Sequence, residues 1–173
     1  MKSNVKAFED CSLKIIYFDV KNLLYSRFYV NKNAFVKAAF DKGGFMSVKQ
    51  VLENVPPDLE SARKLAEVSD EIGTLLYPTN PFFYPRDLLV CCNIFAENQL
   101  APFIDLRRKM RLDDSDWLRT TRCHAECCNA DWYACGDFEW DERMKMFQDR
   151  YFHLSSESGI DDAVITNIRE TLL

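Results

Sequence analysis

The densest group of potentially reactive side chains is the stretch CHAECCNADWYAC at residues 123–135. Zinc sites need about four nitrogen or sulfur ligands arranged as a tetrahedron, and this stretch offers Cys123, His124, Cys127, Cys128 and Cys135. The spacing lacks the two paired knuckles that are typical of zinc-binding domains. We therefore expect thiols packed between helices and no bound metal, with zinc as the alternative.

The same stretch does not predict a catalytic nucleophile. A Cys–His enzyme needs a base close to the thiol, and the side chains of the neighbours Cys123 and His124 diverge on a helix. No phosphate-binding loop, nucleophile elbow or calcium-binding loop is present. The acids of DDSDW (113–117) and DFEWDE (137–142) fall where helix N-termini are expected, so we interpret them as caps. We expect a protein without catalytic residues or a cofactor.

Basic residues form a second group, whose chemistry would be phosphate contact. They follow one another in RRKMR and continue on the next predicted helix: Arg107, Arg108, Lys109, Arg111, Arg119 and Arg122. Two such helices predict a basic strip for the phosphates of RNA or another polyanion. The alternative is a solvated face that neighbouring aspartates partly neutralise.

A third group is IIYFDVKNLLYSRFYV, residues 15–30, which contains five aromatic residues together with Lys21, Asn22 and Arg27. Residues 1–50 hold nine Lys or Arg against four Asp or Glu, while the rest of the chain is acidic. Exposed aromatics stack on bases, and nearby cations hold phosphates. The Ile, Phe and Leu positions are expected in the core. The candidate RNA-contacting residues are Tyr17, Lys21, Asn22, Arg27 and Tyr29.

Part of this stretch resembles the La motif, the winged-helix RNA-binding module of La and La-related proteins. The resemblance is carried by the spacing of Tyr17, Phe18, Asn22, Leu23 and Phe28, and by DKGGFMSVKQVLENV downstream. It spans residues 13–55, and it departs from the family pattern at Leu13, Ile16 and Ser26. The resemblance implies RNA as the ligand.

The elements that must position these groups are predicted to be helices. Only five glycines occur, and apolar residues recur mostly at three- and four-residue spacing. We expect a first helix from about residue 4 to Tyr25, another near 34–40, one capped by Ser47 and one capped by Asp58. Further helices are expected near 86–98, 102–111, 115–128, 138–153 and 160–171.

The segment YPTNPFFYPRD, residues 77–87, has three prolines and four aromatics and predicts a connector. The predicted fold is therefore all-α, with about eight or nine helices in a compact bundle. Its parts are a basic subdomain at 1–76, the connector, and a second subdomain at 88–173. Exposed rings of the connector would suit a protein partner: Tyr77, Phe82, Phe83 and Tyr84.

Composition indicates a globular domain, since hydrophobic residues make up 47% of the 173 residues. No apolar run is long enough for a membrane span, and seven cysteines in an odd set suggest reduced thiols in the cytoplasm. Two hypotheses follow. The first is a small helical RNA-binding protein that contacts the phosphate backbone of single-stranded or duplex RNA with weak sequence preference. We expect it to form a homo-oligomer, as a viral protein that sequesters RNA would. The second is a non-enzymatic adaptor for protein partners.

Overall fold

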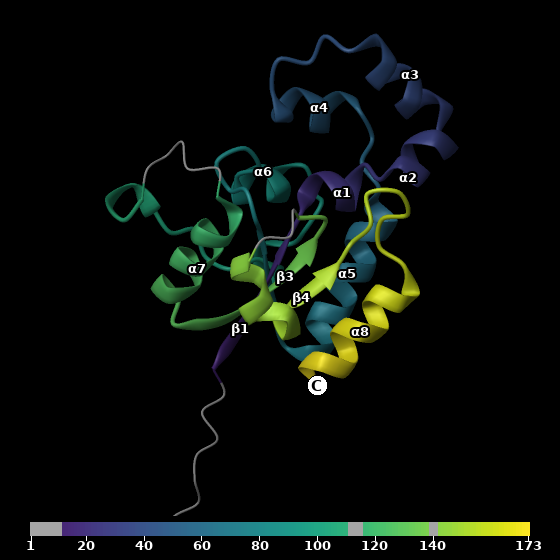
Figure 1. Ribbon diagram of the computed structural model, residues 1–173. Coiled ribbons are helices and arrows are strands. Elements are labelled where there is room, and N and C mark those ends of the chain that lie inside the picture. Colours follow the sequence, from purple (N-terminus) through teal and green to yellow (C-terminus); the bar gives the residue numbers. More distant parts are fainter. Residues whose placement is uncertain (1–11, 111–115, 139–141) are drawn as a thin grey trace, which may run out of the picture.

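The protein folds around a four-stranded parallel sheet, in a computed structural model that describes residues 12–110, 116–138 and 142–173. The strands lie in the order β2-β1-β3-β4. Their bounds are Leu13–Phe18 (β1), Leu75–Pro78 (β2), Ala130–Gly136 (β3) and Tyr151–His153 (β4). All three pairings are parallel. The predicted all-α helical bundle is therefore wrong, and the fold is α/β (Figure 1).

The described ranges also contain eight α-helices. They are α1 Val20–Leu24, α2 Arg27–Lys32, α3 Ala34–Lys42, α4 Val48–Asn54, α5 Leu59–Ile72, α6 Arg86–Cys91, α7 Trp117–Cys127 and α8 Asp162–Leu172. Short 3-10 helices lie at η1 Glu97–Gln99, η2 Leu106–Arg108 and η3 Glu142–Arg150. None of the helices in the described ranges is long and apolar enough to cross a membrane.

Strand β1 shows why the sheet was missed. Successive side chains of a strand point to opposite faces, and here both faces are buried. Ile16 and Phe18 pack in one core cluster, whereas Ile15 and Tyr17 pack in another. Parallel strands covered on both faces appear in a sequence as continuous apolar runs without alternation, so IIYF has no period that would distinguish it from a buried helix.

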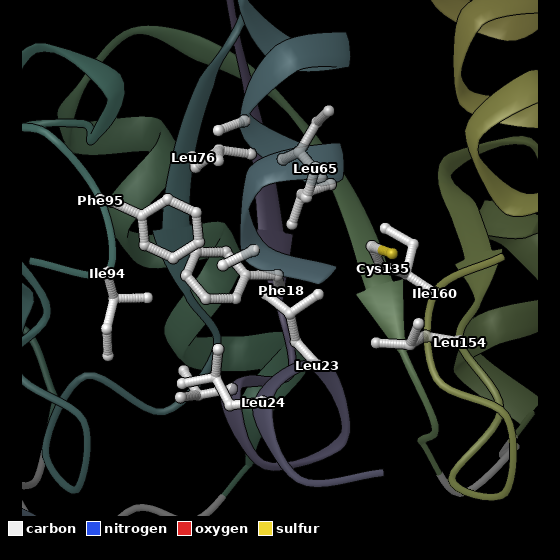
Figure 2. Close-up of a cluster of buried hydrophobic side chains, with 14 of the residues drawn as sticks. Phe18, Leu23, Leu24, Leu65, Leu76, Ile94, Phe95, Cys135, Leu154 and Ile160 are labelled. Carbon is white, nitrogen blue, oxygen red and sulfur yellow. The ribbon is translucent and has the colours of Figure 1, made fainter. Parts of the chain in front are cut away.

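Two helical layers cover these faces. Helices α5 and α8 contribute Leu65, Ile168 and Leu172 to the larger cluster, which also contains Phe18 with its ring centre 5.1 Å from that of Phe95. Figure 2 shows this cluster between β1, α5 and the segment after β4. Helix α7 covers the opposite face through Ala125.

Four predicted helices differ from the structure. The helix expected at 86–98 is shorter and ends at Cys91 as α6. The chain from Leu13 to Phe18 is a strand, and the part of the predicted first helix before residue 12 lies outside the described residues. In the predicted helix at 102–111, the described residues form only the 3-10 turn η2. The predicted helix at 138–153 contains η3 and then strand β4, because His153 and its neighbours pair with β3.

Helix capping was predicted more successfully. The side chain of Asp58 accepts a hydrogen bond from the Ser61 amide at the start of α5, and that of Ser47 accepts one from the Gln50 amide at the start of α4. Such caps satisfy amides that the first helical turn leaves without partners. Both predicted caps are confirmed.

The chain order creates a reversal in the sheet. From β1 the chain passes through α5 to β2 on one side, and later through α7 to β3 on the other side of β1. Strand β1 before residues 77–87 and strands β3 and β4 after them thus belong to one sheet. The division into subdomains at 1–76 and 88–173 stays a prediction. Helices α2, α3 and α4 form an arm between β1 and α5 that projects from the sheet layer (Figure 1).

Candidate functional site

The carboxyl end of β1 carries Asp19. Its backbone amide donates to the Cys135 carbonyl at 2.9 Å. Its carboxylate caps α1, accepting from the Asn22 amide at 3.3 Å and from Asn22 Nδ2 at 2.6 Å. Asp19 is half-buried, so the carboxylate stays at the edge of the sheet.

The carboxyl end of β3 carries a second acid, Asp137. It is exposed, and its Oδ1 lies 3.5 Å from Nε2 of His153 at the end of β4. Since β1 and β3 are paired in parallel up to Phe18 and Cys135, Asp19 and Asp137 follow the ends of neighbouring strands.

Gly136 allows these two ends to approach. A Cβ at this position would lie 2.8 Å from Cβ of Asp19 and 2.4 Å from the ring of Phe138. The Tyr151 hydroxyl donates to the Gly136 carbonyl at 2.7 Å. Burial raises the pKa of Tyr151, and the nearby carboxylates of Asp137 and Asp19 raise it further. The phenol therefore stays neutral and can donate to the strand end.

A pocket of about 440 Å³ is lined in part by α1, the helix that follows β1. Its walls are rings and aliphatic side chains from α1, α2, α3, α4 and the segment before α6: Tyr25, Val30, Phe40, Val48, Val51, Leu52 and Tyr84. Lys21, Arg27 and Asn31 also line it. Burial raises the pKa of Tyr84, and the charge of Asp19 raises it further. We call this pocket the arm pocket.

The loop after β4 holds the arm against the sheet. The backbone amides of Arg27 and Phe28 donate to the carbonyls of Ser156 and Glu157 at 2.9 and 2.8 Å. The Arg27 guanidinium also pairs with the Glu157 carboxylate at 2.5 Å. Because both charged groups are well exposed, this ion pair adds little stability and leaves Arg27 accessible to a ligand.

The five candidate residues of β1 and the first helices are divided by the structure. Tyr17 is 1% exposed, so it faces the core and is no longer a candidate for RNA contact. Tyr29 is half-buried, and its hydroxyl donates to the Pro56 carbonyl at 2.8 Å. Lys21 and Arg27 line the arm pocket, with Asn22 beside them on α1.

The second basic group lies elsewhere. Arg119 and Arg122 line a different pocket of about 480 Å³, between α7 and the first residues of β3. Arg107 is paired with Asp105, which keeps the pKa of that carboxyl at about 2, through the hydrogen bonds of Arg107. Arg108 and Lys109 are exposed beside it, and Arg111 lies outside the described residues. The two basic groups share no pocket among those described here.

The four aromatic residues of the predicted connector differ in their exposure to solvent. Tyr77 is buried on β2, and Phe82 and Tyr84 are half-buried. Phe83 is 62% exposed. The segment therefore offers one ring, not four, as a surface anchor.

The cysteine–histidine group is split by the sheet. His124 lies on the α7 side, with Nδ1 at 2.7 Å from the Tyr17 hydroxyl and Nε2 at 2.9 Å from the Pro102 carbonyl. Cys135 belongs to the opposite core cluster, where burial raises the pKa of its thiol to about 12. Within the described ranges, no three or more His, Cys, Asp or Glu side chains gather as metal ligands.

No protein-family model, curated protein or solved structure matches the chain. The candidate site therefore depends on its own geometry. The La motif resemblance stays a prediction. The residues that carry it lie on β1, α1 and α2 and, for the downstream part, from the end of α3 to the end of α4.

The sequence reasoning missed the two acids at the strand ends. Asp19 was placed inside a helix, and Asp137 was interpreted as a helix cap. A usable signal was present at Asp19, because an apolar run followed directly by an acid and then by Asn22 fits a buried strand with a capped helix after it.

Proposed function

We propose that this α/β domain binds single-stranded RNA at the carboxyl edge of its sheet. The observation that carries the proposal is the arm pocket. It places Lys21 and Arg27 around a wall of Tyr25, Phe40 and Tyr84, next to the end of β1.

Sheet topology supports this location. In open parallel sheets, ligands bind outside the carboxyl ends of the strands, where the strand order reverses. Here the reversal lies between β1 and β3, where Asp19 and Asp137 are found. Lys21, two residues after Asp19, lines the arm pocket, which has the size of a small-molecule site.

The chemistry of the pocket suits a nucleotide unit of a flexible chain. Unpaired bases stack on aromatic side chains, while Lys and Arg hold the phosphates. Here Tyr25, Phe40 and Tyr84 provide rings for base stacking, and Lys21 and Arg27 provide cations for the phosphates. A duplex would keep its bases stacked inside and would contact only the cations, so single strands are preferred.

Fluorescence anisotropy with labelled single-stranded and double-stranded RNA tests the proposal, at about 50 and 200 mM salt. We expect tighter binding of the single strand, weakening steeply with salt, and a loss of about tenfold or more in Lys21→Glu. Lys145→Glu is the control, because it reverses an exposed charge on η3. Equal effects of the two reversals, or no binding at low salt, would contradict the proposal.

A second candidate is hydrolysis of the bound strand, favoured by the carboxylates of Asp19 and Asp137 on adjacent strand ends. Mg²⁺ is often held by one or two protein carboxylates together with substrate phosphates, so two acids fit such an ion. When bound, the ion would polarise a phosphoryl oxygen. Cleavage of labelled RNA in Mg²⁺ that disappears in Asp19→Asn and Asp137→Asn would replace the prediction of a non-enzyme.

A further inference from the structure

The arm carries two phenylalanine rings, Phe28 on α2 and Phe35 on α3, that the core does not use. Phe28 is 61% exposed and Phe35 is 65% exposed. Both line a hollow of about 600 Å³ with Tyr29, Lys32 and Leu59. We call Phe28, Lys32 and Phe35 the α2–α3 surface. Apolar rings left in water forgo the free energy of burial, so their exposure needs an explanation.

The charge of this region indicates the kind of partner. Residues 20–54 hold six Lys or Arg against two Asp or Glu, although the whole chain has a net charge of −5. The Lys32 ammonium lies 5.6 Å from the centre of the Phe28 ring. A cation beside an exposed ring offers both contacts that a single-stranded nucleic acid makes, one to the phosphate and one to the base.

A protein partner fits this surface less well. Cores of protein interfaces are depleted of lysine, whereas here Lys32 lies over one ring, and Asn33 lines the hollow between α2 and α3. Asp58 and Glu60 border the hollow at the start of α5. A phosphate chain would therefore follow the Lys32 side, away from these acids.

Helix α2 connects this surface to the arm pocket. Arg27, Val30 and Asn31 face the arm pocket, while Phe28, Tyr29 and Lys32 face the second hollow. The two hollows are thus separated by the width of one short helix. A strand with one base in the arm pocket reaches the second hollow by crossing α2.

We propose that single-stranded RNA leaving the arm pocket crosses α2 and stacks further bases on Phe28 and Phe35, with Lys32 holding a phosphate. This inference rests on the proposed function and extends it, since it makes the α2–α3 arm a second contact for longer strands. Short ligands that fill only the arm pocket do not contact the α2–α3 surface.

The double variant F28A/F35A tests this extension. Anisotropy is measured with a labelled uridine dinucleotide and with a labelled oligouridylate of about 12 nucleotides. Each lost stacking contact lowers affinity by roughly tenfold, so the longer strand should bind F28A/F35A at least tenfold more weakly, while the dinucleotide affinity stays unchanged. Phe83→Ala removes an equally exposed ring at another position and is the matched control.

The outcomes separate this inference from the proposed function. If the wild-type protein binds both RNAs and F28A/F35A binds the longer one unchanged, the extension is wrong and the arm-pocket site remains. If the wild-type protein binds neither, both proposals fail. Sedimentation velocity completes the test: a variant that changes self-association but not RNA affinity would make this surface an interface between copies of the chain.

Discussion

The backbone amide of Asp19 donates to the Cys135 carbonyl at 2.9 Å, which ties the end of β1 to the end of β3. This bond follows the last register pair of the two strands, Phe18 with Cys135. It holds the first turn of α1 at the point where the strand order reverses. The candidate site therefore depends on how closely these two strand ends approach.

Gly136→Ala tests that approach. The added Cβ would meet the Phe138 ring and Cβ of Asp19, and overpacking of this kind costs about 1–3 kcal/mol. We expect a lower urea midpoint and weaker RNA binding. Because the Phe138 ring can move and the Asp19 Cβ cannot, G136A/F138A should recover only part of the stability. An unchanged midpoint in Gly136→Ala would show that the strand ends are less tightly packed than described.

Two buried tyrosines of one cluster should respond differently to loss of their hydroxyls. Tyr17 and Tyr77 are each 1% exposed. The Tyr17 hydroxyl is bonded to His124 Nδ1. Tyr17→Phe leaves this buried nitrogen with only the weak Cys128 thiol at 3.8 Å, and it should cost about 1–3 kcal/mol in the free energy of unfolding.

Tyr77→Phe is the matched variant. The Tyr77 hydroxyl lies near the Ile104 amide but forms no hydrogen bond of normal geometry. Its removal should change the free energy of unfolding by less than about 1 kcal/mol, or raise it. Urea denaturation of both variants measures the difference, and equal losses would contradict the hydrogen-bond assignment.

The environment of His124 predicts a dependence of stability on pH. Nε2 faces the Pro102 carbonyl, which only accepts, so Nε2 carries the proton and Nδ1 accepts from Tyr17. Burial lowers the pKa of His124 below its ordinary value of 6.5, and the bond to Pro102 offsets part of this shift. The unfolded chain then binds a proton at a higher pH than the folded protein does.

Stability should therefore be full above about pH 6.5 and fall as the pH drops below it, by at most about 1.4 kcal/mol per pH unit. Urea midpoints at about pH 7.5 and 5.5 measure this loss. His124→Gln should reduce the pH dependence, although it is less stable at both pH values. His153→Gln, which changes the other histidine of the chain, should retain it; the reverse pattern would contradict the assignment.

The local elements were predictable where a side chain caps a helix. Asp58 and Ser47 mark the starts of α5 and α4 because each bonds an amide within its own first turn. Helix α8, expected at 160–171, is observed at Asp162–Leu172, where Asp161 is the cap. A hydrogen bond between residues three positions apart depends only on the local sequence, so it can be predicted from that sequence.

The sheet was not predictable by the same means. Leu13 pairs with Ala130 and Ile15 with Leu75, and such distant pairings leave no local period when both faces are buried. Because the sheet was not predicted, the candidate site at its edge was not predicted either. Asp19 and Asp137 become neighbours only through this register, so each was interpreted from its local context alone.

The most direct test of the central proposal is amide proton–nitrogen correlation spectroscopy of the labelled protein with single-stranded RNA added. The account predicts shifts that cluster at the residues around the arm pocket, among them Lys21, Asn22, Arg27 and Tyr84. Shifts confined to Arg119, Arg122 and Trp132 would move the site to the α7 pocket and contradict it.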